Sequence, residues 1–419
     1  MNYLEEIGIA AVEASTILSQ TQTVQRNKAL KILSELLIEN SSQIINNNKK
    51  DIVIAKKNGR STAYLERLLL DANRIEKIAN NINSIITLPD PINEIFDQFT
   101  AENGLTIEKI RIPLGVIGSI YESRPEVTID IASLSIKSGN TCILRGGSDS
   151  INSNNILTTL CQKALKISGL PQKSVQLITN LDRAEVSQIL EMDKYINLII
   201  PRGNENLISF VKEKAKMPVI TGGIGVCHIF VDEEANIEKA MNIIENAKIQ
   251  KPSACNAVDT ILLHKNIIDK SLPKIAAPLI EKKVQLRCDQ ISKKILSKAN
   301  YPVVLAKESD WGKEFLSLVL AIKVVNSFDD AIKHIEKFGS GHSEAIITEN
   351  QNTSDKFLKE VDSAAVYVNA STRFTDGFEF GLGAEVGIST DKLHARGPMG
   401  LKELTSYKWL IHGKGQIRH

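Results

Sequence analysis

The pattern of apolar and polar positions changes near residue 85 of the chain. Up to that point apolar residues recur at helical spacing, and Leu30, Leu33 and Leu37 fall on one face of a predicted helix. Beyond it, short apolar runs rich in β-branched residues alternate with helical patterns. The sequence therefore predicts helices over residues 3 to about 85, followed by an α/β region.

The alternating region consists of two blocks. In the first block we expect strands at 113–121, 141–145, 175–179 and 196–203, and helices at 127–138, 150–168 and 183–192. In the second block we expect strands at 226–232, 260–264, 303–306, 320–325, 344–348 and 363–369, and helices at 236–249, 329–337 and 351–361. Strands that alternate with helices form parallel sheets, so the predicted fold class is α/β, with two doubly wound domains.

Two further segments do not belong to this alternation. Residues 105–112 and the final run W-L-I-H-G-K-G-Q-I-R-H show strand-like alternation around glycine turns. They predict a small sheet outside both domains. Because exposed strand edges of this kind pair with other chains, we expect a homo-oligomer.

Composition and charge narrow the function classes. The chain has 419 residues, too many for one typical core, and 42% of them are hydrophobic. A net charge of +2 argues against a dedicated nucleic-acid-binding protein. No apolar run is long enough to span a bilayer, and the N-terminus carries two early glutamates instead of a basic leader. We therefore expect a cytoplasmic protein that binds neither membrane nor nucleic acid.

The five cysteines suggest one reactive thiol. They lie at 142, 161, 227, 255 and 288, without a C-x-x-C pair, so neither a zinc site nor a disulfide framework is expected. Cys142 and Cys227 lie in apolar strand patterns, and Cys161 and Cys288 in helix-like or mixed segments. Cys255 lies in the polar, loop-like stretch K-P-S-A-C-N-A-V. This setting makes Cys255 the candidate nucleophile, because a nucleophilic thiol needs access and a polar environment.

Two glycine turns are candidates for binding phosphate groups. R-G-G-S-D-S (145–150) and P-R-G-N-E-N (201–206) each follow a predicted strand, where backbone N–H groups can bind an anion. Glycine and asparagine also serve turn geometry alone, and both interpretations stay open. The candidates for cofactor binding are Arg145, Gly146, Gly147, Arg202, Gly203 and Asn204. G-L-G-A-E-V-G (381–387) departs from the dinucleotide fingerprint by one residue, and we do not expect it to be a Rossmann loop.

Four motifs, taken together and in order, carry a family resemblance. They are I-T-G-G-I-G-V-C-H, Q-K-P-S-A-C-N-A-V, V-Y-V-N-A-S-T-R-F-T-D-G and L-H-A-R-G-P-M-G-L. The chain resembles the γ-glutamyl phosphate reductase family of the aldehyde dehydrogenase superfamily, from about residue 110 to the C-terminus and weakly through the N-terminal helices. The resemblance implies NADPH-dependent reduction of L-glutamyl 5-phosphate to glutamate 5-semialdehyde and phosphate, the second step from glutamate to proline.

The resemblance also implies an aldehyde dehydrogenase-like domain layout. We expect a cofactor-binding domain over 1–100 and 113–225 and a catalytic domain over 226–368. A return segment with the substrate-binding loop is expected over 369–399, and an oligomerisation sheet over 101–112 and 400–419.

Roles for single residues follow from the resemblance and from their chemistry. Cys255 matches the family nucleophile, which would form a thioester; its backbone N–H and the Asn256 side chain are candidate oxyanion donors. Glu314 resembles the superfamily glutamate that holds the nicotinamide ribose. The T-G-G turn has Thr221 where hydrolytic relatives carry a glutamate base, which favours exchange with phosphate over hydrolysis. Gly222 and Gly223 of this turn are assigned to cofactor binding.

The substrate's α-carboxylate needs a cationic partner. Arg124 and Arg373 are the candidate forks for it, because guanidinium groups bind carboxylates in a bidentate manner. Asn369, Ser371 and Thr372 lie beside Arg373 after a predicted strand, where α/β sheets present ligand-binding loops. Arg145 is the candidate for the 2′-phosphate of NADPH, and His394 is either a phosphate partner or a structural histidine.

Other functions were weighed against this one. Thiol-dependent oxidation of another small aldehyde is the main alternative, and the missing acid at Thr221 argues against it. A reductase of the glyceraldehyde-phosphate dehydrogenase type would open with a strand and a G-x-G-x-x-G motif, which this chain lacks. A non-catalytic descendant would be expected to lose Cys255. Because the acyl phosphate is unstable in water, we also consider association with the glutamate 5-kinase that makes it.

Overall fold

The structure, a computed structural model, describes residues 2–222 and 224–418. Its contacts divide the chain into two compact units. Unit 1 comprises Met1–Gly222, Gly381–Gly387 and Met399–His419, and unit 2 comprises Gly223–Phe380 and Ile388–Pro398. The expected return segment 369–399 is therefore shared between the two units.

The N-terminal part of unit 1 is helical, as the sequence predicts. Its helices are α1 (Tyr3–Ser19), α2 (Thr23–Glu39), α3 (Ser41–Lys57), α4 (Thr62–Leu68) and α5 (Ala72–Thr87). Leu30, Leu33 and Leu37 lie on the buried face of α2, and this helix packs against α5 and against α7 (Ile151–Ile167). Residues spaced by three or four share one helix face, so the apolar stripe seen in the sequence is the packing face.

A parallel sheet of four strands forms the α/β part of unit 1, in the order β5-β4-β3-β6. The strands are β3 (Val116–Tyr121), β4 (Thr141–Gly146), β5 (Val175–Leu177) and β6 (Leu198–Arg202). The helices that alternate with them are α6 (Glu126–Lys137), α7, α8 (Arg183–Ile189) and α9 (Glu205–Lys214). The strand order reverses at β3, which places the loops after β3, β4 and β6 at one switch point.

An antiparallel sheet of three strands also belongs to unit 1, in the order β1-β2-β16. Its strands are β1 (Ile95–Thr100), β2 (Thr106–Pro113) and β16 (Thr405–His412). The pairing of β2 with β16 brings the two segments singled out in the sequence together, from Thr405 opposite Pro113 to His412 opposite Thr106. The sequence pattern did not reveal β1, whose six residues are all exposed and so lack an apolar face to signal a strand.

Unit 2 is built on a parallel sheet of seven strands, in the order β10-β9-β11-β8-β7-β12-β13. The strands are β7 (Cys227–Val231), β8 (Val258–His264), β9 (Gln285–Cys288), β10 (Val303–Leu305), β11 (Val319–Val325), β12 (Ser343–Ile347) and β13 (Ala365–Val368). Its helices are α10 (Ile237–Ile249), α11 (Ile268–Glu281), α12 (Gln290–Lys298), α13 (Phe328–Phe338) and α14 (Gln351–Glu360).

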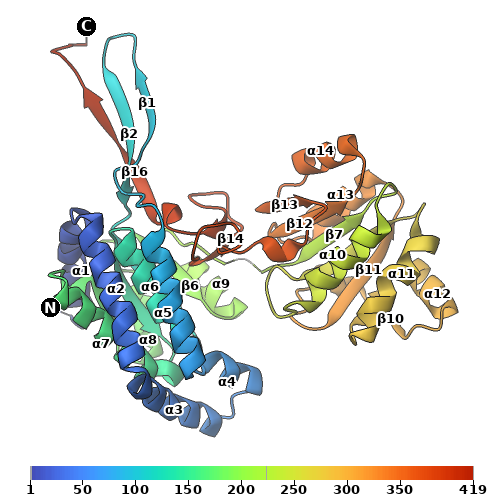
Figure 1. The fold of residues 1–419 in the computed structure, drawn as a ribbon, viewed down its shortest axis with the longest axis horizontal. Coiled ribbons are helices and arrows are strands. Elements are labelled where there is room, and N and C mark those ends of the chain that lie inside the picture. Colours follow the sequence, from blue (N-terminus) through green and yellow to red (C-terminus); the bar gives the residue numbers. More distant parts are fainter. Residues whose placement is uncertain (1, 223, 419) are drawn as a thin grey trace. The chain divides into compact units, whose positions relative to one another are not determined.

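Helices cover both faces of this sheet (Figure 1). Residues of α10, α11 and α12 share one apolar core with the strands, and residues of α13 and α14 share a second. In this core of unit 2 the sequence did not predict α11, β9 and α12, and in unit 1 it did not predict α9. Pro273 and Pro278 lie inside α11 and obscure its helical pattern, and Cys288 lies at the end of β9, not in a helix.

The run G-L-G-A-E-V-G connects parts of the fold and does not open a βαβ unit. It precedes β14 (Gly387–Ser389), which pairs with β15 (Gly397–Met399). Gly381 and Gly383 have φ values of 75° and 69°, and a β-carbon on Gly383 would stand 2.7 Å from Leu88. These glycines therefore serve chain geometry and close packing.

Among residues 2–222 and 224–418, no helix is both long and apolar enough to cross a membrane. Within the same ranges, no cluster of histidine, cysteine, aspartate and glutamate side chains could hold a metal ion.

Candidate active site

Cys255 is the cysteine with partial solvent access, and the other four are buried. Two tight turns hold its loop between α10 and β8, with Ala254 N–H donating to the Lys251 carbonyl and Ala257 N–H to the Ala254 carbonyl, both at 3.1 Å. The Cys227 thiol on β7 donates to the carbonyl oxygen of Cys255 at 3.3 Å. The thiol is thus accessible while its backbone is fixed, as a nucleophile requires.

Gly225 packs directly against this loop. A β-carbon at residue 225 would stand 1.5 Å from the Cys255 carbonyl oxygen, so glycine alone fits there. The Gly225 N–H donates to Glu314 Oε1 at 2.9 Å. Glu314, the predicted partner of the nicotinamide ribose, therefore uses one carboxylate oxygen to hold the glycine that supports the nucleophile loop.

Asn256 braces the cysteine loop against the loop that carries Arg373. Its Nδ2 donates to the carbonyl oxygens of Arg373 at 3.2 Å and Thr375 at 2.8 Å, and Thr372 Oγ1 donates to the Asn256 carbonyl at 2.7 Å. An amide nitrogen has two hydrogens, and both are used here. The Asn256 side chain is therefore a brace in this structure, and its expected role as an oxyanion donor stays a prediction.

Arg373 lies beside the nucleophile. It follows β13 in a short helical turn (Thr372–Phe374), and its Nε donates to Gln250 Oε1 at 2.8 Å, at the end of α10. Burial lowers the pKa of the half-buried guanidinium, while its electrostatic interaction with Cys255 opposes that shift. This arrangement places a fixed positive charge near the thiol, and positive charges favour the thiolate form.

The neighbours of Arg373 hold the loop together. Asn369 has a φ of 54°. Its side-chain Oδ1 accepts from Thr348 N–H at 3.1 Å, and its Nδ2 donates to the Thr348 carbonyl at 2.8 Å. Ser371 Oγ accepts from Arg373 N–H at 3.3 Å. These contacts position Arg373. Substrate contacts by Asn369, Ser371 and Thr372 stay predictions.

The two glycine turns of unit 1 lie at the carboxyl ends of β4 and β6, the two strands that flank β3. Tyr121, the last residue of β3, is in register with Gly146 on one side and Arg202 on the other. The loop after β4 leads into α7, and the loop after β6 leads into α9. Asn204 caps the N-terminus of α9, where its Oδ1 accepts from Leu207 N–H at 3.0 Å. The structure thus brings both predicted turns to one edge of one sheet.

The donors at this edge suit an anionic cofactor such as NADPH. A β-carbon on Gly147 would meet Glu122 Cα at 3.8 Å, an ordinary contact distance, so the backbone of this turn is not tightly packed. Asp149, the acid within the turn, is neutralised by Arg60 at 2.7 Å and also accepts from Tyr64 at 3.0 Å. Arg145, whose Nη2 donates to the Leu181 carbonyl at 3.3 Å, and Arg202 are the cationic residues of the two turns. Backbone N–H groups at such turns bind phosphate.

Sequence reasoning overlooked Glu122. It follows β3, and its Oε2 accepts from Asn204 Nδ2 at 2.9 Å, so a carboxylate lies between the two turns. Ligands of doubly wound sheets bind outside the carboxyl ends of the strands at such a switch point, so this carboxylate lies where it can accept hydrogen bonds from a ligand. Its place directly after a predicted strand was the available signal.

A second overlooked group lies on α6. Burial, together with Glu126, raises the pKa of Asp130 to about 7, against the effect of Arg202 and Arg124. Burial also raises the pKa of Glu126. The spacing of four residues on a helix was the sequence signal that these two carboxyl groups share a face. Arg124 itself is exposed, and its role as a carboxylate partner stays a prediction.

The remaining predicted residues are placed as follows. Gly222 forms an isolated bridge position in unit 1, and Gly223 lies outside the described residues. Thr221 is buried in the same turn. His394 adopts a left-handed conformation with φ of 71°, and its two interpretations, phosphate partner or structural histidine, stay predictions.

Comparison with known proteins places the chain in a class. Residues 4–293 match the aldehyde dehydrogenase family. An acetylating aldehyde dehydrogenase from Geobacillus thermoglucosidasius has a TM-score of 0.71 at 16% identity, over 99% of this chain and 97% of that one, and shows the shared fold. The parallel sheets are therefore those of an aldehyde dehydrogenase-type α/β protein.

Higher similarity narrows the class further. The γ-glutamyl phosphate reductase of Dehalococcoides mccartyi strain 195 is 51% identical over 416 residues, covering 99% of this chain and 98% of that protein. The crystal structure of γ-glutamyl phosphate reductase from Thermotoga maritima has a TM-score of 0.97 at 44% identity and covers all of both chains. The chain belongs to the γ-glutamyl phosphate reductase family.

Proposed function

We propose that this protein reduces L-glutamyl 5-phosphate with NADPH, releasing glutamate 5-semialdehyde and phosphate, as the second step from glutamate to proline. The observation that carries this proposal is the accessible Cys255, on a braced loop beside the Arg373 guanidinium. Full-length identity of about half to curated γ-glutamyl phosphate reductases supports the choice of substrate.

The chemistry begins at Cys255. Its thiolate attacks the acyl carbonyl carbon, the C–S bond forms, and phosphate leaves with the electrons of the C–O bond, giving a thioester. The negative charge that develops on the carbonyl oxygen needs a donor, and the backbone N–H of Cys255 is the candidate, since Asn256 uses both amide hydrogens elsewhere. NADPH, when bound, would supply a hydride to the thioester carbonyl carbon; the C–S bond then breaks, releasing the aldehyde and returning the Cys255 thiolate.

Other residues bind and orient. Arg145, Gly146, Gly147, Arg202, Gly203 and Asn204 would hold the phosphates of the cofactor, and Glu314 would contact its ribose. Arg373 would pair with the substrate's α-carboxylate, because a guanidinium held by Gln250 keeps further N–H groups for a ligand. Thr221 offers no carboxylate to activate water, which protects the thioester from hydrolysis.

The test runs the reaction in reverse, because the semialdehyde is easier to handle than the acyl phosphate. The protein is mixed with glutamate 5-semialdehyde and NADP, with and without inorganic phosphate, and absorbance of NADPH is followed. Phosphate-dependent reduction of NADP that is lost in Cys255→Ala and kept in Cys161→Ala supports the proposal. Turnover without phosphate would assign the alternative, oxidation of a small aldehyde to an acid.

Assembly and location remain separate predictions. The exposed β1-β2-β16 sheet supports a homo-oligomer, which light scattering would test. The instability of an acyl phosphate in water motivates association with glutamate 5-kinase, and a pull-down without association would contradict it. The cytoplasm is the expected compartment.

A further inference from the structure

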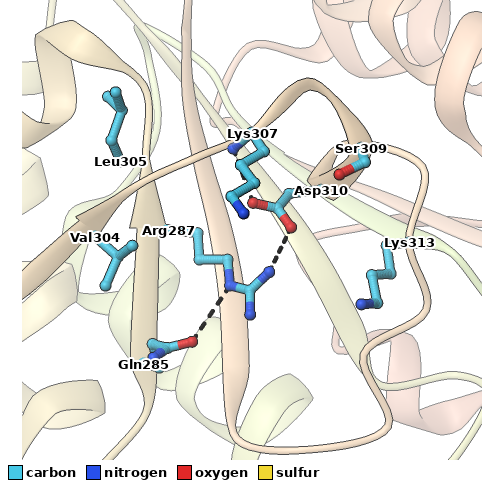
Figure 2. A pocket seen from close by; sticks show the side chains of 8 residues that line it. All are labelled: Gln285, Arg287, Val304, Leu305, Lys307, Ser309, Asp310 and Lys313. Atoms are coloured by element: carbon cyan, nitrogen blue, oxygen red, sulfur yellow. Dashed lines mark hydrogen bonds and ion pairs between the residues drawn. The ribbon is translucent and has the colours of Figure 1, made fainter.

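A cavity of 330 Å³ lies at the β10 edge of the sheet in unit 2. Strands β9 and β10 supply Arg287, Val304 and Leu305, and the segment after β10 supplies Lys307, Asp310 and Lys313 (Figure 2). The mechanism proposed above uses none of these residues. The cavity therefore requires an explanation of its own.

The charges in this cavity are unbalanced. Arg287 pairs with Asp310, and its Nε donates to Gln285 Oε1 at 3.3 Å. Figure 2 shows Lys307 and Lys313 on either side of this pair. Neither ammonium group is within ion-pair distance of a carboxylate among the residues that the structure describes. Three cations and one carboxylate leave a charge of +2 around the cavity (3 − 1 = 2).

The wall of the cavity also has an apolar part. Val304 and Leu305 on the edge strand β10 are 47% and 44% exposed, so they offer apolar surface to a ligand in the cavity. Lysine ammonium groups bind phosphate as point charges, and the Ser309 hydroxyl at the rim adds a hydrogen-bonding group. We propose that this cavity binds a small phosphate monoester, with the dianion on Lys307 and Lys313 and the organic group against Val304 and Leu305.

The cavity is connected to the nucleophile through one short segment. Arg287 stacks on the ring of Phe315 at 5.1 Å, and the Phe315 N–H donates to Asp259 Oδ1 at 3.3 Å. Glu314, between Lys313 and Phe315, accepts from the Gly225 N–H, and Gly225 packs on the Cys255 carbonyl. A ligand that draws Lys313 toward Lys307 therefore acts on the residue that supports the cysteine loop.

The inference is that the bound monoester modulates the reactivity of Cys255. This regulatory part builds on the proposed function, because it assumes that Cys255 is the working nucleophile. The binding part stands on the cavity alone. A coupling of this kind requires that the ligand favour one arrangement of the 308–315 segment over another.

Binding is tested with phenyl phosphate by calorimetry on the full chain. We compare the natural protein with Lys307→Gln/Lys313→Gln and with the control Lys270→Gln/Lys274→Gln, which removes two exposed charges from α11. Loss of two nearby cations should weaken binding about tenfold, and the control should leave it unchanged. Equal affinity in the two double variants, or no saturable binding at all, would overturn the proposal.

A second arm replaces phenyl phosphate with inorganic phosphate. Contact of the ring with Val304 and Leu305 should make phenyl phosphate bind at least about threefold more tightly. Equal affinities would assign the cavity to free phosphate and overturn the monoester assignment. Hydrogen exchange should slow in residues 308–315 when phenyl phosphate is bound, and slowing elsewhere only would place the ligand at another site.

Coupling is tested without turnover. The rate at which iodoacetamide alkylates Cys255 is measured by mass spectrometry with and without phenyl phosphate. We expect at least a twofold change in rate that is absent in Lys307→Gln/Lys313→Gln. An unchanged rate with saturated binding would overturn the regulatory part. Because this measurement needs neither substrate nor NADPH, its failure is distinguishable from failure of the proposed function.

Discussion

The backbone of Gly225 lies so close to Cys255 that a β-carbon at residue 225 would stand 1.5 Å from the Cys255 carbonyl oxygen. The clash is with backbone, so no side-chain rotation relieves it. Gly225→Ala should destabilise unit 2 by about 1–3 kcal/mol and displace the cysteine loop. A displacement near 1 Å at a nucleophile costs about 100-fold in kcat.

Thermal unfolding and steady-state kinetics of Gly225→Ala measure these two effects. The matched control is Gly312→Ala, where a β-carbon would meet Phe338 at an ordinary 3.6 Å. Wild-type kcat in Gly225→Ala would show that the loop accommodates the methyl group and that its tight packing has no catalytic consequence.

Reaction with alkylating reagents should be confined to one thiol. Burial raises the pKa of Cys142 and Cys288 to about 12, and it also raises the pKa of Cys161 and Cys227. Thiolates are the reactive form, so iodoacetamide at pH 8 should modify Cys255 first, with loss of activity in proportion. Peptide mass spectrometry over time measures the order, and early modification of Cys227 would contradict it.

Asn256→Ala should loosen the Arg373 loop. The substitution leaves the Arg373 and Thr375 carbonyls without their donor, at a cost of about 2 kcal/mol or more, since Asn256 is buried. As a brace, Asn256 should affect KM for the acyl substrate and increase hydrogen exchange in residues 371–375. As an oxyanion donor it would lower kcat alone by about 100-fold or more. A change in KM for the acyl substrate would therefore indicate a brace, and a fall in kcat alone would indicate an oxyanion donor.

The buried Lys248–Asp259 pair should be costly to break. Nζ and Oδ1 are 3.1 Å apart, and burial lowers the pKa of Lys248 and raises that of Asp259 against their mutual attraction. Lys248→Met leaves an unpaired buried carboxylate and should lower the free energy of unfolding by about 3–5 kcal/mol. The double variant Lys248→Met/Asp259→Leu should recover part of this lost stability. Lys239→Met, which breaks an exposed pair with Glu349, should cost no more than about 1 kcal/mol in urea unfolding.

His334 should make stability fall in acid. Burial between Trp311 and Phe338 lowers its pKa to about 3, while the unfolded chain keeps a value near 6.5. Between pH 3 and pH 6.5 His334 is therefore protonated in the unfolded chain and neutral in the folded protein. The contribution of His334 to the free energy of unfolding is fully present above pH 6.5 and decreases as the pH falls toward 3. His334→Phe should remove this part of the slope, up to about 1.4 kcal/mol per pH unit.

Urea unfolding of both proteins at pH 7.5 and 5.0 measures the His334 effect. His412→Phe on the exposed β16 strand is the control. Parallel pH profiles for the natural protein and His334→Phe would show that another group carries the acid sensitivity.

Much of the fold was predictable because local patterns decide it. The helices of the first 87 residues and most strands of both sheets follow from apolar spacing, since each buries one face in its own core. Elements without such a pattern were missed. β1 is exposed along its length, α11 contains two prolines, and β9 is only four residues long.

The sequence by itself determined the chemistry available to this protein: one cysteine in a polar loop, two glycine turns after strands, and the motifs of a reductase family. Only the tertiary structure decided which distant segments the side chains of the candidate site hold together. The side-chain amides of Asn256 and Asn369 bind backbone groups of distant segments, while the catalytic role expected of Asn256 and the substrate contact expected of Asn369 stay predictions. The close packing of Gly225 on Cys255 and the cavity lined by Lys307 and Lys313 are visible only in the structure. A linear pattern carries no information on which distant residues a side chain will meet.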